Sequence, residues 1–201
     1  MSRTVALVDA GAANTFNVTA ALEALGLEVV RARRPADLLG ADAIVFPGVA
    51  HFGFVAAALE RSGLDEALRN ALARGVPYLG ICAGLQILFE GSDESPGARG
   101  LGVLAGRVCK LQGPRSQHMG WNVVRWNGDV DPRDGWAYFA HAYAVPADAP
   151  SAAALSDYGG PFAAVCVQAN VAGVQFHPER SGAYGRAVLR RFFAEAPAYA
   201  R

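Results

Sequence analysis

One short stretch, Pro77 to Gln86, constrains the fold of this chain more than any other. An apolar run at residues 76–81 is typical of a short buried strand, and it stops at Cys82 between Gly80 and the pair Ala83-Gly84. Apolar residues at helical spacing follow. A strand that turns directly into a helix at such a residue has the outline of a nucleophile elbow, and small neighbours leave room for the strained turn. We therefore expect Cys82 at a helix N-terminus, where the helix dipole favours the thiolate.

A second stretch, Gly173-Val174-Gln175-Phe176-His177-Pro178-Glu179, supplies what a nucleophilic cysteine needs. A lone cysteine in an apolar run is more often an inert buried thiol, and a nucleophile requires a base whose tautomer is held by a third group. Pro178 favours an extended backbone at His177, and residues two apart in an extended segment point the same way. The sequence therefore predicts a triad of Cys82 as nucleophile, His177 as base and Glu179 as its orienting carboxylate.

The composition of the 201 residues limits the class of protein. A hydrophobic share of 52% is ordinary for a globular protein, so we expect one domain over residues 1–201. The formal net charge of zero argues against electrostatic binding of nucleic acid or a membrane surface. The three cysteines are widely spaced, which fits a reduced cytoplasmic compartment and gives no metal-ligand spacing. The N-terminus has too few apolar residues for a signal peptide or a spanning helix, and we expect no metal and no cofactor.

Alternating segments in the first half of the chain predict an α/β fold. The elements expected there are strands at residues 4–8, 27–30, 43–46 and 76–81, helices at 14–25 and 53–74, and a helical turn at 37–39. Such alternation implies a mostly parallel central sheet flanked by helices, with ligands gathering at the carboxyl ends of the strands. After a loop at 91–100, short β-like runs up to residue 175 predict added antiparallel strands, and a last helix is expected at 183–196.

Several motifs resemble those of the class I (triad) glutamine amidotransferases, and the resemblance runs over essentially the whole chain. The four segments that carry it are Pro47-Gly48-Val49, Gly80-Ile81-Cys82-Ala83-Gly84-Leu85-Gln86, His118-Met119-Gly120-Trp121-Asn122 and Gly173-Val174-Gln175-Phe176-His177-Pro178-Glu179. The third of these, with Tyr138-Phe139-Ala140-His141-Ala142-Tyr143, is similar to one branch of the family, the glutaminase subunits of imidazole glycerol phosphate synthase in histidine biosynthesis. The resemblance implies a flavodoxin-like amidotransferase fold.

The same resemblance implies that the chain hydrolyses glutamine to glutamate and ammonia. Cys82 would attack the side-chain amide carbon, His177 would pass the thiol proton to the leaving nitrogen, and Glu179 would orient His177. Backbone amides for the oxyanion are expected at Ala83 and at one of Gly48, Val49 and Ala50. The residues that the family places against the substrate glutamine are Gln86, His141, Ala142 and Tyr143.

A partner is also implied, because free ammonia becomes non-nucleophilic ammonium at neutral pH. The family passes ammonia through a (β/α)8-barrel cyclase subunit, which makes imidazole glycerol phosphate and an aminoimidazole carboxamide ribotide. The residues expected on the interface of this heterodimer are His118, Met119, Gly120, Trp121, Asn122 and Arg180. Without the resemblance, Trp121 would equally fit a core position.

Two departures from the family pattern concern turns. Ala50 stands where the family usually has glycine, and Ala10-Gly11-Ala12-Ala13-Asn14 replaces a turn richer in glycine. Glycine reaches a positive φ at less cost than alanine. We therefore expect Ala50 to alter how glutaminase activity is gated.

Three alternative functions remain open from the sequence. A glutaminase that serves pyridoxal phosphate synthesis shares the cysteine and His-Pro-Glu motifs, but it usually has Pro-Gly-Gly-Glu-Ser at the position of residues 47–51 and lacks His-Met-Gly-Trp-Asn. A binding or regulatory module would have lost catalysis, which the intact triad residues argue against. A general cysteine hydrolase would show no preference for a glutamine-like electrophile at Cys82.

Overall fold

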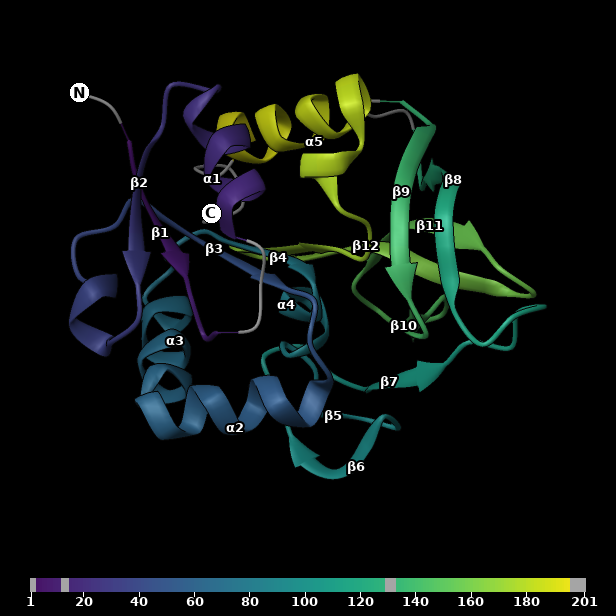
Figure 1. Cartoon of the computed structure of the whole chain (residues 1–201), viewed down its shortest axis with the longest axis horizontal. Coiled ribbons are helices and arrows are strands. Elements are labelled where there is room, and N and C mark those ends of the chain that lie inside the picture. The colour runs from purple at the N-terminus through teal and green to yellow at the C-terminus, as the bar shows by residue number, and fades with distance from the viewer. Residues whose placement is uncertain (1–2, 12–14, 129–132, 196–201) are drawn as a thin grey trace.

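The centre of the fold is a sheet whose first half is parallel (Figure 1). The chain, seen here as a computed structural model, is described at residues 3–11, 15–128 and 133–195. In spatial order the parallel strands are β2 (Glu28–Ala32), β1 (Thr4–Val8), β3 (Ala43–Gly48), β4 (Tyr78–Cys82) and β13 (Val171–Val174). This arrangement confirms the predicted α/β class with a mostly parallel central sheet.

The position of β13 decides where a site can form. This strand comes from late in the sequence, yet it pairs in parallel with β4, with Gly173 opposite Gly80 and Val174 opposite Ile81. Because both strands run in the same direction, the residues that follow them leave the sheet at the same edge. The segment that carries His177 therefore arrives beside Cys82.

Helices cover both faces of the parallel half, as Figure 1 shows. The helices are α1 (Thr15–Glu23) and α5 (Gly182–Glu195) on one face and α2 (Phe52–Ser62) and α3 (Leu64–Ala73) on the other. Successive residues of a strand point to opposite faces, so Val5 and Leu7 of β1 join the apolar cluster under α1 and α5, whereas Ala6 and Val8 join the cluster under α2 and α3. The two buried clusters hold the sheet as a rigid platform.

The second half of the chain extends this sheet mainly with antiparallel strands, as predicted. The strands that continue it beyond β13 are β12 (Pro161–Gln168), β10 (Tyr143–Pro146), β7 (Arg107–Lys110), β5 (Gly91–Ser92) and β6 (Ser95–Arg99). Three further strands form a branch from β12, namely β11 (Ala152–Asp157), β8 (His118–Trp126) and β9 (Gly135–His141). The β8–β9 ladder stands at the right of Figure 1, beyond the carboxyl ends of the parallel strands.

Four details differ from the sequence-based expectation. The predicted helix at 53–74 is two helices, because Gly63 takes a left-handed conformation with φ 69° that ends α2 and redirects the chain. The predicted loop at 91–100 contains the β5–β6 hairpin. The third strand, β3, continues through Pro47. Within the described residues this last part of β3 pairs only with β4, because the pairing of β3 with β1 ends at Val45. The helix after Cys82 is the short α4 (Ala83–Gln86).

Smaller shifts affect the element ends. The 3-10 turn η1 covers Pro35–Leu38, close to the predicted turn at 37–39. Residues 12–14 of the unusual turn and residue 196 of the last predicted helix lie outside the described residues.

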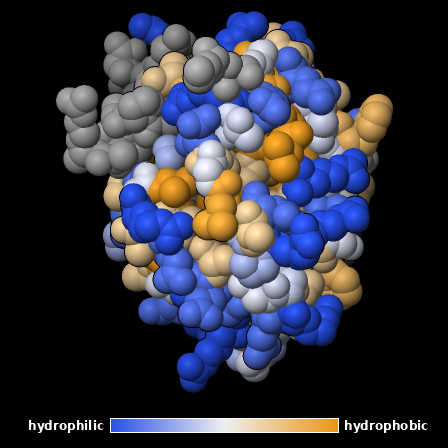
Figure 2. Space-filling view, turned by 90° about the vertical axis from the view of Figure 1, so that its left-hand side faces the viewer, coloured by the Kyte–Doolittle hydropathy of each residue, from blue (hydrophilic) through white to orange (hydrophobic). Residues whose placement is uncertain are grey.

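β2 forms an exposed edge of the sheet. The face on that side of the molecule shows polar side chains around small apolar areas (Figure 2), and the strand itself carries exposed Glu28 and Arg31. Charged side chains discourage a sheet edge from pairing with another chain. Within the described residues, none of the helices has the length and apolar character needed to cross a membrane.

Candidate active site

Cys82 sits on a strained turn between β4 and α4. Its backbone has φ 53° and ψ −108°, and among the described residues other than glycine only Ala169 also has a positive φ. A Cβ atom at Gly84 would collide with the Phe46 carbonyl oxygen, and one at Gly80 would collide with the Gly84 carbonyl. The small residues beside the cysteine are thus a steric requirement of the elbow, as the sequence indicated.

His177 is held at the end of β13 by its backbone. Its N–H donates to the Tyr138 carbonyl (2.9 Å), and its carbonyl accepts from the Ser181 hydroxyl (2.6 Å). Its φ of −100° and ψ of 95° are extended, as predicted. Glu179, however, lies in the 3-10 turn η2 (Pro178–Arg180), so alternation along an extended strand is not what brings it to His177. The turn curls the carboxylate back, and Glu179 Oε1 lies 2.9 Å from His177 Nδ1.

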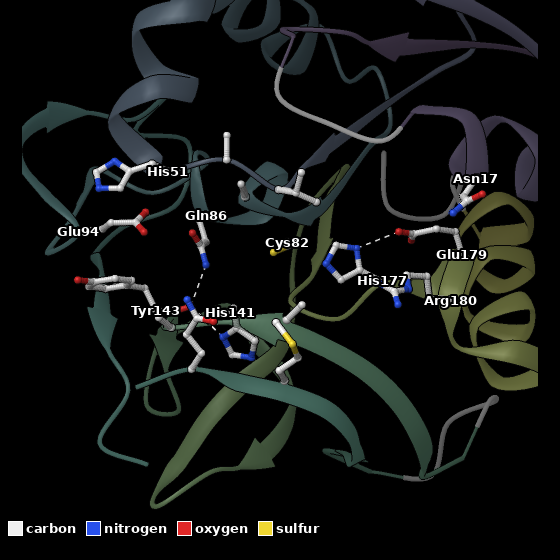
Figure 3. Close-up of a pocket in the computed structure, with 17 residues that line it drawn as sticks. Asn17, His51, Cys82, Gln86, Glu94, His141, Tyr143, His177, Glu179 and Arg180 are labelled. Atoms are coloured by element: carbon white, nitrogen blue, oxygen red, sulfur yellow. Dashed lines mark hydrogen bonds and ion pairs between the residues drawn. The ribbon is translucent and has the colours of Figure 1, made fainter. Parts of the chain in front are cut away.

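The imidazole of His177 lies between the sulfur of Cys82 and the carboxylate of Glu179 (Figure 3). Burial lowers the pKa of His177, but hydrogen bonds and charge from Cys82 and Glu179 outweigh it and raise the pKa to about 10. Because Glu179 binds Nδ1, the other ring nitrogen is left for the sulfur. The arrangement stabilises a thiolate–imidazolium pair, which is the form in which a cysteine attacks.

These three side chains line a cavity of about 640 Å³. The other predicted site residues that also line it are Val49, Ala50, Ala83, Gln86, Met119, His141, Ala142, Tyr143 and Arg180. Gly48 is not among the lining residues, but it lies opposite Cys82 in the β3–β4 ladder. The cavity therefore gathers residues from seven separate parts of the sequence at the edge where the parallel strands end. Within the described residues, no three His, Cys, Asp or Glu side chains are grouped so that they could hold a metal.

Gln86 is fixed by two hydrogen bonds from its amide nitrogen. Gln86 Nε2 donates to the Tyr143 carbonyl (2.8 Å) and to Gln175 Oε1 (3.1 Å), while Gln175 Nε2 lies 3.6 Å from Cys82 Sγ. Since both N–H groups of Gln86 have partners, its Oε1 is the group left for a ligand. Gln175, which is fully buried, was not among the predicted site residues, although a glutamine directly after the apolar run 171–174 is a signal in the sequence that could have singled it out.

Glu94 is a second residue that the sequence analysis missed. It lies in the turn between β5 and β6, where its Oε2 accepts a hydrogen bond from the N–H of Phe52 at the start of α2 (2.7 Å), and it lines the cavity. The neighbouring Ser95 hydroxyl accepts from Gly53 (3.0 Å), so the hairpin caps the helix. A carboxylate at the rim gives the cavity a group that favours a cationic ligand end.

The structure divides the His118–Asn122 motif between two environments. The side chains of Met119 and Trp121 are exposed at 66% and 54%, whereas His118 is exposed at only 4% and faces the interior. The Arg180 guanidinium stacks on Tyr138 at 4.0 Å, and Trp121 contacts the same ring edge-on. His118, expected on the partner interface, is therefore an interior residue, because alternate side chains of β8 point to opposite sides.

Ala50 is accommodated without backbone strain. It is not among the described residues with a positive φ. Alanine in place of glycine therefore adds no backbone strain in the conformation seen here. An effect of Ala50 on activity would require a second conformation in which this residue has a positive φ.

Comparison with known proteins supports the geometric interpretation. Residues 6–196 match the glutamine amidotransferase class-I family. A protein of Deinococcus radiodurans, named imidazole glycerol phosphate synthase subunit HisH, is 43% identical over 205 residues, which cover 96% of this chain and 95% of the relative. The HisH subunit of Thermus thermophilus is 43% identical over 192 residues, or 93% of this chain and 96% of the relative.

Solved structures support the fold independently. A structure described as a glutamine amidotransferase has a TM-score of 0.78 at 21% identity, and the match covers 96% of this chain and 98% of the other. PurLQS from Thermotoga maritima matches with a TM-score of 0.78 at 20% identity over the full length of both chains. The family match and the identity to curated relatives show that this chain belongs to the class-I glutamine amidotransferases.

Proposed function

We propose that this chain is the glutaminase subunit of an imidazole glycerol phosphate synthase and that it supplies ammonia for histidine biosynthesis. The observation that carries this proposal is the imidazole of His177, set between the Cys82 sulfur and the Glu179 carboxylate at the base of the cavity. The names of the relatives and their 43% identity select this branch of the family. On this proposal residues 1–201 are one amidotransferase domain that works in the cytoplasm without a cofactor or a metal.

The triad supports covalent catalysis with balanced proton transfers. The Cys82 thiolate attacks the amide carbon of glutamine, and the His177 imidazolium gives its proton to the nitrogen as the C–N bond breaks, which releases ammonia. Water then attacks the thioester while His177 takes its proton, and glutamate leaves as the thiolate is restored. The Ala83 amide, together with an amide of residues 48–50, is the donor set proposed for the oxyanion, and each such donor is worth about 3–4 kcal/mol of transition-state stabilisation.

The other cavity residues fit the two charged ends of glutamine. Gln86 Oε1 and the Glu94 carboxylate are acceptors that suit the α-ammonium group. The backbone at residues 141–143 lines the opposite wall, and we assign it to the remaining contacts of the substrate. This division leaves the amide end of glutamine directed towards Cys82.

The rim of the cavity supports docking of a (β/α)8-barrel cyclase subunit. Val49, Met119 and Trp121 are exposed apolar side chains on segments that line or border the cavity. Such exposed apolar groups around a site mark a protein interface. A relative in Arabidopsis thaliana, named imidazole glycerol phosphate synthase hisHF, matches this chain over only 33% of its own length, so its polypeptide carries a further part. We propose that in this protein the cyclase covers the rim and receives the ammonia.

A glutaminase assay with two partners tests this proposal. We expect glutamate release to rise strongly when the cyclase subunit and its ribotide ligand are added, and not when a pyridoxal phosphate synthase subunit is added in its place. Stimulation by the second partner alone would support the alternative branch. Absence of glutamate release with either partner would contradict the assignment as a glutaminase.

A further inference from the structure

Two buried histidine rings lie at one wall of the cavity, which His141 lines and which His118 supports from the interior. His118 opens β8 and His141 closes β9, and the two residues are directly opposite in the ladder. His118 Nδ1 lies 3.1 Å from His141 Nε2, and both side chains are buried. The triad chemistry assigns no role to either ring.

Asn122 fixes one end of this pair. Its Nδ2 donates to the Asp157 carbonyl (2.7 Å), and its Oδ1 accepts from the Val123 N–H (2.8 Å), so the orientation of the amide is determined by backbone groups. The same Nδ2 lies 3.2 Å from His118 Nε2. That ring nitrogen must therefore be an acceptor, which places the ring proton of His118 on Nδ1.

The Tyr143 carbonyl fixes the other end. His141 Nδ1 lies 3.0 Å from this oxygen, which can only accept, so His141 also carries its proton on Nδ1. Its Nε2 is then free to accept from His118 Nδ1. The donors and acceptors run in one direction, Asn122 to His118 to His141 to the Tyr143 carbonyl, and one protonation pattern alone satisfies every bond.

The surroundings keep both rings neutral and fixed. His118 is stacked between Phe139 and Tyr158, with ring centroids 4.7 and 4.4 Å away. Burial lowers the pKa of His118 to about 4 and is the main cause that lowers the pKa of His141 to about 3. Neither ring is charged at neutral pH, so the pair acts through its hydrogen bonds.

The chain of bonds ends in the active site. The Tyr143 carbonyl that accepts from His141 also accepts from Gln86 Nε2 (2.8 Å), while the preceding Ala142 carbonyl is held separately by the Leu111 N–H (3.0 Å). We propose that His118 and His141 are positioning residues, whose hydrogen-bond chain orients the Tyr143 carbonyl and, through it, the side chain of Gln86 in the wall that receives glutamine. The inference rests on the proposed function and adds that buried side chains of β8 help to hold the wall of the glutamine site in place.

Two variants of His118 separate this role from simple packing. His118→Leu removes the donor to His141, and we expect the KM for glutamine to rise about three- to tenfold, the range for loss of one net hydrogen bond, with a smaller change in kcat. His118→Asn places an amide N–H near the position of Nδ1 and should restore most of the wild-type KM. Both are measured in the complex with the cyclase subunit, where synthesis from added ammonia should stay at the wild-type rate.

A matched control comes from the ring stacked on His118. Tyr158→Phe keeps the stacking and removes only the hydroxyl bond to the Gln117 carbonyl, so it should keep the wild-type KM. An equal rise in KM for Tyr158→Phe and His118→Leu, or no rise for His118→Leu, would overturn the positioning role.

Nitrogen NMR of the histidine rings tests the bond directions without any activity assay. The chain has only four histidines, which makes their assignment practical. In the wild type we expect His118 and His141 to be neutral with the proton on Nδ1. In His118→Leu we expect His141 to keep its proton on Nδ1, where the Tyr143 carbonyl still accepts it, while the signal of its Nε2 moves downfield because that nitrogen no longer accepts a hydrogen bond. Protons on Nε2 in the wild type would overturn the inference. If the wild type releases no glutamate, the proposed function fails, and this measurement still decides the hydrogen-bond chain.

Discussion

The parallel and antiparallel halves of the sheet hold the two sides of the active site by different means. On the parallel side, Cys82 is fixed by backbone sterics, with a positive φ and a neighbouring Gly84 that has no room for a side chain. On the antiparallel side, the wall at residues 141–143 is held by hydrogen bonds from buried side chains. The same β8 that anchors this wall exposes Met119 and Trp121 on its other side.

This difference teaches which side of the site can respond to a partner. A close-packed turn has one conformation, and any change in it is costly. A wall supported by side-chain hydrogen bonds and bearing exposed aromatic residues can be adjusted by whatever docks on it. We therefore expect changes in the parallel half to abolish chemistry or stability, and changes in the antiparallel half to modulate binding.

The largest effect is expected for Cys82→Ala. Removal of the nucleophile should lower glutamine-dependent activity by about 10⁴-fold or more, whereas synthesis from added ammonia in the complex should persist because docking uses other residues. The measurement is product formation with either nitrogen source. Retained glutamine-dependent synthesis would show that the nucleophile has been misassigned.

Glu179→Gln should have the next largest effect on turnover. The neutral glutamine side chain no longer stabilises the charged imidazole of His177 or holds its orientation as the carboxylate does, so we expect kcat to fall by about 10²–10⁴-fold with little change in KM. The raised pKa of His177, about 10, means that the wild type keeps the catalytic proton up to alkaline pH and loses activity as the pH rises through that value. Without the carboxylate the alkaline limb of the pH–rate profile should move to lower pH; an unchanged limb would contradict the role of Glu179.

A pair of glycine substitutions compares the stability of the two halves directly. Gly84→Ala introduces a collision with the Phe46 carbonyl, so the free energy of unfolding should fall by about 3 kcal/mol. Gly120→Ala in β8 meets no atom within 4 Å, but its φ of 133° is unfavourable for alanine, and a loss of about 1 kcal/mol is expected. Urea unfolding curves of both variants test the comparison, which fails if Gly120→Ala is the more damaging change.

The smallest effect is expected for Ala50→Gly. Glycine lowers the cost of a positive φ in the strand end beside Cys82 by about 1 kcal/mol, so basal glutaminase activity should rise up to about fivefold. The stimulation by the cyclase subunit should fall in proportion. Identical stimulation ratios for the two proteins would remove any role of this residue in gating.

The parts of the site that the sequence predicted are those in which local sterics decide the outcome. Cys82 between small residues and His177 before proline carry their conformational requirements in the adjacent residues. The sequence analysis correctly placed Glu179 beside His177, but for the wrong reason. An extended segment was expected, whereas residues 178–180 form a 3-10 turn that brings the carboxylate to the imidazole.

The parts that the sequence did not predict depend on contacts between distant segments. Glu94 caps α2 from a hairpin that was expected to be a loop, and Gln175 reaches Gln86 across the sheet. The interior position of His118 was available from the alternation of β8, in which Met119 and Trp121 face outward. The sequence analysis instead assigned all of residues 118–122 to the interface, and so it did not separate the side chains that face inward from those that face outward.

The pairing of β13 with β4 also has a consequence for synthesis of the protein. Cys82 is translated long before the segment that carries its base, because residue 171 of β13 pairs with residue 78 of β4, which lies 93 residues earlier in the chain (171 − 78). A nascent chain that has not yet released β13 from the ribosome holds a cysteine without its proton acceptor. The triad can therefore form only after the segment up to Glu179 has emerged and β13 has paired with β4, so a chain released before that point would hold the nucleophile without its base.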